Sequence, residues 1–258
     1  MHVISLIVCI ILICLSFIIY KKITSLSIDN QINHFVENVD VWSDIDGYFC
    51  FTIADLNQDG RVELIVSTIQ GSGSYSYTKY YEMEDNGTDI KQLQADEDSV
   101  GLIDDFLAGK QISDGTQRNV DNGISYVSVY HDRELEKYYY ICYDYSGHTP
   151  YESFKTIYSL SLENDRIVEN LLANKISKYE EPYGSIQSIE YWDSNNNQIS
   201  EDAYNKIADE VYKNAEHMEM SWQWNRVETK EEIREMDKAE LKELLMEAYY
   251  NFEIYMVE

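Results

Sequence analysis

A short stretch of the chain, Asp55 to Glu63, carries oxygen-bearing side chains at a spacing that suits a metal ion. Counted from Asp55, these side chains stand at positions 1, 3, 5 and 9, and a glycine stands at position 6. In such a loop alternate side chains converge on one point, and the glycine allows a sharp turn. The predicted ligands are Asp55, Asn57, Asp59 and Glu63, together with the backbone carbonyl of Arg61 at position 7.

The donor set points to Ca²⁺. Three carboxylates and one amide oxygen suit a hard cation, whereas zinc prefers histidine and cysteine, and neither is nearby in the sequence. An EF-hand is excluded because its twelfth position needs a glutamate, and here that residue is Val66. We expect a structural Ca²⁺ that fastens a turn between two strands. The competing interpretation is an Asx-rich turn closed by its own side chains without a metal.

The ten residues from Asp55 to Leu64 (DLNQDGRVEL) resemble the calcium loop of FG-GAP and VCBS-type repeats, with Glu63 where that loop usually has aspartate. The resemblance implies calcium binding between two strands. A propeller would need several such repeats, and the sequence contains one. The wider pattern is similar to uncharacterised membrane-anchored surface proteins of Gram-positive bacteria, which combine one such loop with a tyrosine-rich sheet and a late helix, here Ile199 to Tyr204. That group has no assigned activity to carry over.

A second segment, which begins at Asp193, repeats the 1, 3, 5 and 9 spacing. Its oxygen-bearing residues are Asp193, Asn195, Asn197 and Glu201. Gln198 stands in the place of the glycine, and the segment has only two carboxylates. We therefore expect a turn here, directly before a helix that Ser200 caps.

The N-terminus predicts a membrane anchor. Val3 to Tyr20 contains no charged residue, and its 18 residues would span about 27 Å as a helix, close to the thickness of the hydrocarbon core. A cleaved signal peptide is the main rival, but no Ala-x-Ala-like cleavage site follows the apolar run. We expect residues 1–22 to form the transmembrane anchor and residues 23–258 to form a single acidic domain.

The orientation of the anchor depends on two opposing arguments. Lys21 and Lys22 follow the apolar run, and the positive-inside rule would keep the domain in the cytoplasm. A single calcium loop is expected to bind weakly, in the range of extracellular modules, and that favours the outside. We expect a single-pass protein of the cell membrane whose domain is extracellular.

The charge of the chain restricts its partners. The 258 residues include 20 Lys+Arg and 47 Asp+Glu, a net charge of −27. Nucleic acid is excluded because a phosphate-backbone binder needs a basic surface. The 23 tyrosines and 44% hydrophobic content also exclude a disordered acidic tail. The balance favours cations and basic partners.

Periodicity predicts an α+β domain with a mainly antiparallel sheet and flanking helices. The expected helices are Ile28 to Trp42, a segment after Ser200 that uses Tyr204, Ile207 and Val211, and a final helix that follows a Thr229/Glu232 capping box and includes Met236 and Phe252. The expected strands are Tyr48–Ala54, Val62–Ile69, Tyr75–Met83, Ile124–His131, Lys137–Asp144, Thr156–Leu162, Arg166–Leu172, Ile186–Trp192 and a stretch around Met218 to Trp224. Gln94–Gly109 fits a short helix.

No catalytic motif emerges from the remaining residues. The histidines lack metal-binding spacing, and no G-x-S-x-G occurs. Cys50 and Cys142 can pair in an extracellular domain, or can remain buried thiols. The leading hypothesis is a non-catalytic surface domain with a calcium loop that binds a protein or glycan partner. The alternatives are an anchored immunity or inhibitor protein against a basic toxin, and a hydrolase with paired carboxylates.

Overall fold

The computed structural model describes residues 27–44, 49–70, 75–84, 89–95, 124–227 and 229–257. The predicted membrane segment, the Gly/Ser turn at 71–74 and most of the segment 94–109 lie outside these residues. No helix in the described part of the chain is long and apolar enough to cross a membrane.

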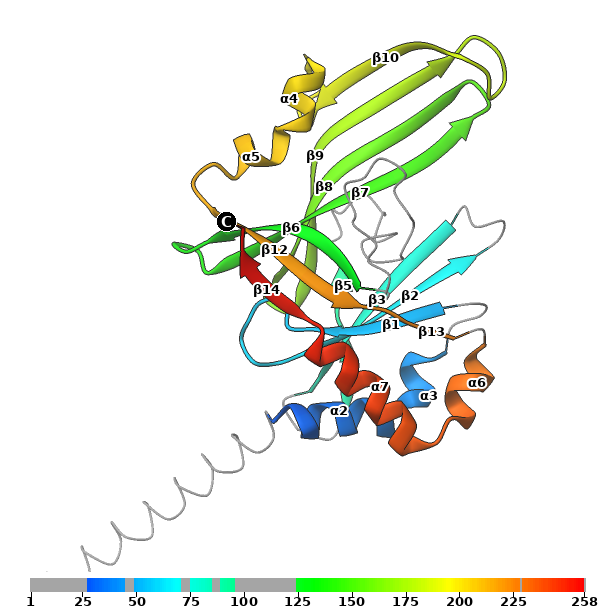
Figure 1. Ribbon diagram of the computed structural model, residues 1–258, viewed down its shortest axis with the longest axis vertical. Helices are drawn as coiled ribbons and strands as arrows, with labels where there is room; N and C mark the ends of the chain where they lie inside the picture. Colours follow the sequence, from blue (N-terminus) through cyan, green and yellow to red (C-terminus); the bar gives the residue numbers. More distant parts are fainter. Residues whose placement is uncertain are drawn as a thin grey trace, which may run out of the picture.

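Within the described residues, the strands form two antiparallel sheets with one short parallel addition (Figure 1). The first sheet has the order β13 (Asn225–Val227), β1 (Phe49–Ala54), β2 (Glu63–Gln70), β3 (Tyr75–Met83) and β4 (Ile90–Gln92). The second sheet has the order β11 (Gln198–Ile199), β10 (Ile186–Asp193), β9 (Arg166–Tyr179), β8 (Glu152–Glu163), β7 (Lys137–Thr149), β6 (Ile124–Asp132), β12 (Glu216–Gln223) and β14 (Glu253–Met256). The parallel addition is β5 (Gln94–Ala95), which pairs with β9.

The two sheets pack against each other through one face each. This inner core joins Ile65 and Tyr80 of the first sheet to Val129, Tyr140 and other side chains of the second. Because side chains alternate along a strand, the neighbouring residues point to the other face of each sheet. There, the first sheet buries Phe51 and Leu64 against helices. The alternation explains why the strands contain so many apolar and tyrosyl residues: several of them are covered on both faces.

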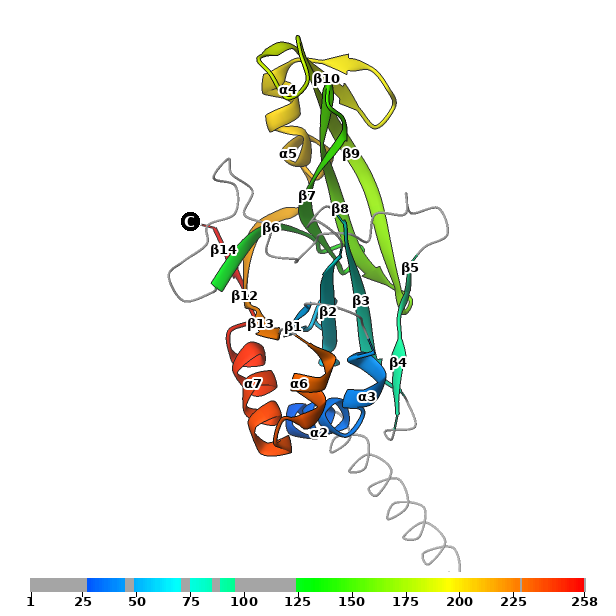
Figure 2. The same ribbon diagram turned by 90° about the vertical axis from the view of Figure 1, so that its right-hand side faces the viewer.

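Helices cover the outer face of each sheet (Figure 2). The first sheet carries α2 (Ile28–Glu37), α3 (Val39–Trp42), α6 (Lys230–Glu235) and α7 (Lys238–Tyr250). The second sheet carries the two short helices α4 (Glu201–Asn205) and α5 (Ile207–Val211). The predicted caps are present, since Ser200 accepts from the Ala203 N–H and Thr229 accepts from the Glu232 N–H.

The prediction of mainly antiparallel β-structure with flanking helices is confirmed, although the strands form two sheets and not one. The predicted strands between residues 124 and 172 are present as two hairpins and run longer than expected. The final helix was predicted as one and is two. Met236 adopts an extended conformation, and Asp237 caps a new helix by accepting from the Ala239 N–H. Phe252 lies beyond the end of that helix.

Three smaller expectations were also wrong in detail. The first helix is interrupted at Asn38, whose own N–H bonds back to His34, so α2 and α3 are separate. Gln94 and Ala95 belong to a strand, not to a helix. Val211 was expected on the buried side of its helix and is exposed. The errors at Asn38 and Val211 concern an interruption and an end of a helix, where local capping overrides the apolar period, and the error at Gln94 concerns the type of element.

Cys50 and Cys142 do not form a disulfide and are buried in the inner core. They come from opposite sheets, and each donates to a backbone carbonyl, Cys50 to Ser67 and Cys142 to Tyr140. Of the two readings left open by the sequence, the structure shows buried thiols.

Truncating a side chain between the sheets should destabilise the domain strongly. For Ile65→Ala, at a fully buried position of β2, we expect a loss of about 2–5 kcal/mol in the free energy of unfolding. Ile189→Ala, on the exposed part of β10, is the matched control and should cost less than about 1 kcal/mol. Denaturant unfolding checks both, and equal losses would contradict the packing of the two sheets.

Candidate metal centre

The loop from Asp55 to Val62 connects β1 to β2, and its ends are held together by the ladder pair Ala54 and Glu63. Two of its residues have positive φ angles, Gln58 at 58° and Gly60 at 87°. Gly60 meets this requirement at no steric cost, as its position in the motif predicts. Four of the five predicted ligand residues lie in this hairpin loop, and Glu63 is the first residue of β2.

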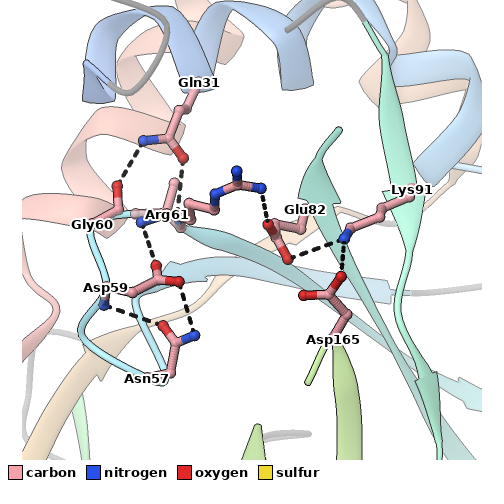
Figure 3. A network of polar contacts seen from close by, with 9 residues as sticks. Gln31, Asn57, Asp59, Gly60, Arg61, Glu82, Lys91 and Asp165 are labelled. Atoms are coloured by element: carbon pink, nitrogen blue, oxygen red, sulfur yellow. Dashed lines mark hydrogen bonds and ion pairs between the residues drawn. The ribbon is translucent and has the colours of Figure 1, made fainter. Parts of the chain in front are cut away.

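The loop is organised by its own carboxylates. The Asp55 carboxylate accepts from the backbone N–H groups of Asp59 (3.1 Å) and Gly60 (3.0 Å). The Asp59 carboxylate accepts from the Arg61 N–H at 2.8 Å and from the Asn57 amide at 3.1 Å (Figure 3). These bonds turn the acidic side chains toward the centre of the loop. They are also the bonds that an Asx-rich turn without a metal would make.

Gln31 of α2 clamps the loop from one side (Figure 3). Its amide nitrogen donates to the Gly60 carbonyl at 2.9 Å, and its amide oxygen accepts from the Val62 N–H at 2.9 Å. The side chain is fully buried. The sequence analysis missed Gln31, although one signal was present: a glutamine stands three residues after Ile28, within the apolar stripe of the helix.

Tyr140 of β7 holds the loop from the second sheet. Its hydroxyl donates to the Leu56 carbonyl at 2.6 Å, within the inner core. Burial, followed by the charges of Glu63 and Asp55, raises the pKa of Tyr140 well above its ordinary value, so the hydroxyl stays protonated as a donor. No sequence signal separates Tyr140 from the other tyrosines of the chain.

Glu63 is the unusual member of the site. It is fully buried, and one of its oxygens accepts from the Leu56 N–H at 2.8 Å. The other oxygen, Oε1, has no hydrogen-bond partner among the described residues. Burial raises the pKa of Glu63 well above its usual range, and the charges of Asp55, Glu82 and Asp59 add to the effect. A carboxylate in this position needs either a proton or a cation.

The neighbouring cations are directed to a different carboxylate. Glu82 of β3 stands directly opposite Glu63 in the ladder. Its carboxylate pairs with Arg61 at 2.8 Å and with Lys91 at 3.8 Å, and Lys91 also reaches Asp165 at 2.6 Å (Figure 3). Like charges directly opposite each other destabilise a sheet. Arg61 and Lys91 relieve this repulsion at Glu82, while Glu63 Oε1 finds no partner in the part of the chain that the structure describes.

The pKa of Asp55 is also raised, but less strongly than that of Glu63. Burial is the main cause that raises the pKa of Asp55 to about 6, and the charge of Asp59 contributes further. Asp55 and Glu63 are therefore two carboxylates whose charged forms are unfavourable in this loop. A cation that contacted both would remove the penalty for both at once.

As it stands in the structure, the loop is not a preassembled metal cluster. Among the described residues, no group of three or more His, Cys, Asp or Glu side chains is gathered closely enough to hold an ion. The donors nevertheless fit a hard cation, since all are oxygens and Glu63 Oε1 has no hydrogen-bond partner within the described ranges.

The second candidate segment is a turn, as predicted. The Asp193 carboxylate accepts from the N–H groups of Asn195 (2.9 Å) and Asn197 (2.8 Å), and from the Asn197 amide. These hydrogen bonds, led by the Asn197 amide, lower the pKa of Asp193. Both loops make Asx-type bonds, but the carboxylate here is stabilised in its charged form, whereas Glu63 is destabilised.

No protein-family model, curated protein sequence or solved structure matches this chain. The resemblance to FG-GAP and VCBS-type loops therefore depends on the ten residues from Asp55 to Leu64, and it remains a prediction.

Two buried tyrosines test the role of the Tyr140 hydroxyl. In Tyr140→Phe the Leu56 carbonyl loses its buried donor, and we expect a loss of about 1–3 kcal/mol in the free energy of unfolding. Tyr80 lies in the same core, but its hydroxyl has no partner among the described residues, so Tyr80→Phe should be neutral or stabilising. Chemical denaturation measures both. The same change in both variants would show that the bond to Leu56 contributes nothing.

Proposed function

We propose that the chain is a non-catalytic, membrane-anchored surface domain with a structural Ca²⁺ in the loop from Asp55 to Glu63, and that it binds a protein or glycan partner. One observation carries the calcium part of the proposal. Glu63 is a fully buried carboxylate with an unpartnered oxygen beneath a loop of oxygen donors. Removing one partner from a buried charge pair is strongly destabilising, so a buried carboxylate is expected to have a counter-charge.

The proposed ion would act on stability rather than on chemistry. The ligands would be the side chains of Asp55, Asn57, Asp59 and Glu63 and the carbonyl of Arg61. When bound, the ion supplies positive charge where the chain places three acidic groups within one loop. Because the loop is attached to α2 through Gln31 and to the second sheet through Tyr140, its rigidity would be transmitted to both.

The carboxylate pair in this region does not support the hydrolase alternative. Glu63 and Glu82 face each other across the ladder and resemble, in number, the paired acids of a glycosidase. Glu63 is fully buried and Glu82 nearly so, and Glu82 is bound to Arg61. A saccharide therefore cannot reach them in this arrangement. The net charge of −27 supports a partner that carries positive charge.

Calcium should raise the melting temperature of the protein. At a free concentration of about 100 times the dissociation constant, linkage predicts about 2.7 kcal/mol of added stability, a shift of roughly 5–10 °C for a chain of this size. Asp59→Ala should abolish the shift. Asp193→Ala is the matched control, because it removes an Asx-turn carboxylate that we do not assign to a metal, and it should keep the full shift. No shift in the wild type would contradict the calcium site.

The Glu63→Gln variant distinguishes a calcium site from an Asx-rich turn that holds no metal. The amide can still accept from the Leu56 N–H but carries no charge, so calcium should no longer raise the melting temperature. Without calcium, the variant should be as stable as the wild type or more stable by about 1–3 kcal/mol, because the buried charge is gone. Calorimetry with and without calcium gives both quantities. A variant that kept the wild-type calcium shift would exclude Glu63 as a ligand.

A further inference from the structure

The second sheet has one edge that its own strands cover only in part. β10 has eight residues, but the two-residue strand β11 pairs only with Tyr191 and Trp192. On the side of β10 away from β9, residues 186–190 therefore have no neighbouring strand within the described part of the chain. Their apolar side chains are accessible, since Ile186 is 54% exposed and Ile189 is 40% exposed.

The backbone of this open edge is oriented for pairing. The Asp193 N–H points away from β9, because it donates to the Asn197 carbonyl across the turn that leads to β11. The direction of the peptide groups alternates along an antiparallel strand, and the pairing with β9 has no register shift from Ser188 to Asp193. The N–H and C=O of Ile189 therefore also point to the open edge. They offer one donor and one acceptor that β9 does not use.

The outermost strands of the two sheets differ from this edge. Natural proteins prevent edge-to-edge pairing with short edge strands and with charged side chains. The outermost strands β4, β13 and β14 have three or four residues, and each carries a charged residue, namely Lys91, Arg226 and Glu253. In contrast, the residues from Pro182 to Ile189 (PYGSIQSI) carry no charge. A bulge precedes Ser188, but the ladder that contains Ile189 is regular.

The turn between β9 and β10 presents a tyrosine next to this edge. Tyr183 is 80% exposed and has a φ of 56°, a left-handed conformation that is costly for a bulky side chain. Its N–H donates to the Pro150 carbonyl of the β7–β8 turn at 2.7 Å, which holds the conformation in place. An exposed aromatic side chain on a fixed backbone is the type of residue that anchors a protein interface.

Acidic residues flank the uncharged edge. Glu180 and Glu181 are exposed in the turn before Tyr183. At the other end, the exposed Glu201 begins α4 and accepts a hydrogen bond from the Tyr191 hydroxyl. A strand added to this edge would meet negative charge at both ends, and complementarity favours basic residues there.

The edge also lies far from the point at which the chain enters the described structure. α2 begins at Ile28 at one end of the long axis, and the β9–β10 turn lies at the opposite end (Figures 1 and 2). A domain anchored through its N-terminus, as proposed above, would hold this edge away from the membrane, where a partner protein has access to it.

We propose that the open edge of β10 binds an extended segment of a partner protein as an added strand, and that this segment is apolar at its centre and basic at its ends. Main-chain hydrogen bonds to Ile189 would supply affinity, and contacts with Ile186, Ile189 and Tyr183 would select apolar side chains. The edge would supply the partner site of the proposed function, on which this inference rests, and it is independent of the calcium loop. A second copy of the chain fits less well, because its own flanking residues are acidic.

A synthetic peptide of alternating valine and threonine, with one lysine at each end, is the probe for this edge. Added to the full-length protein in a non-ionic detergent, it should slow hydrogen exchange at residues 186–190, because the outward Ile189 N–H becomes hydrogen-bonded. A matched peptide with glutamate in place of both lysines should bind at least about tenfold more weakly by fluorescence anisotropy.

Ile189→Pro removes the outward N–H and keeps the bonds to β9, since proline is tolerated where the N–H of an edge strand faces solvent. It should weaken binding of the lysine peptide about tenfold, as expected for the loss of one hydrogen bond, and thermal unfolding checks its fold.

A second variant keeps the backbone and changes only charge. Glu180→Gln combined with Glu181→Gln should weaken binding of the lysine peptide and reduce its dependence on salt. The matched control is Glu134→Gln combined with Glu136→Gln, which removes two exposed acids from the β6–β7 turn, at the other end of β7. The control should keep the wild-type affinity.

Three results would overturn the inference: no binding of the lysine peptide, protection from exchange only outside β10, or equal weakening by both pairs of glutamate substitutions. Sedimentation equilibrium tests the other occupant, and a dimer that Ile189→Pro dissociates would assign the edge to a second copy of the chain. Peptide binding at another surface would reject this edge and leave the partner-binding part of the proposed function standing. Calcium is absent from these measurements, so their failure leaves the calcium proposal untouched.

Discussion

Burying the Glu63 carboxylate is the constraint on which the loop and its surroundings depend. A buried ionised group costs several kcal/mol unless it is paired and hydrogen-bonded. The chain supplies one N–H, from Leu56, and directs its nearby cations, Arg61 and Lys91, to Glu82 instead. The site can therefore be fully stable only when Glu63 takes up a proton or when a cation enters the loop. The second option needs an oxygen-rich loop directly above the carboxylate, and Asp55 to Glu63 is such a loop.

The peptide groups of this loop connect it to elements that are distant in sequence. The Leu56 N–H donates to the Glu63 carboxylate, and the Leu56 carbonyl accepts from the Tyr140 hydroxyl, so one residue joins the loop to both sheets. Gln31 makes the corresponding pair of bonds to Gly60 and Val62 from α2. A change of charge at Glu63 therefore acts directly on Leu56, which belongs to the contact between the sheets. Such an arrangement would suit a structural ion, because Leu56 and Glu63 at the base of the loop are fully buried.

Features set by short-range spacing could be predicted from the sequence, whereas contacts between residues far apart in the chain could not. The loop residues, the hairpins and the caps at Ser200 and Thr229 follow from short-range spacing, and they were predicted. Tyr140 and Gln31 could not be assigned to the loop, because they lie 84 and 29 residues from the backbone groups they contact. The break before Asp237 was a local signal, but a continuous apolar period across Met236 competed with it. β13 was not predicted, because a strand of three residues is too short to show a periodic pattern.

The charged residues of the chain can be grouped by where they lie in the structure. Among the described residues, Glu63 and Glu82 are the only buried acids, and the other acids are at least partly exposed to solvent, which screens their charges. One place departs from this pattern. At Glu63 a negative charge is buried directly opposite Glu82, and this arrangement costs free energy in the chain alone. A cation bound in the loop above Glu63 would remove that cost.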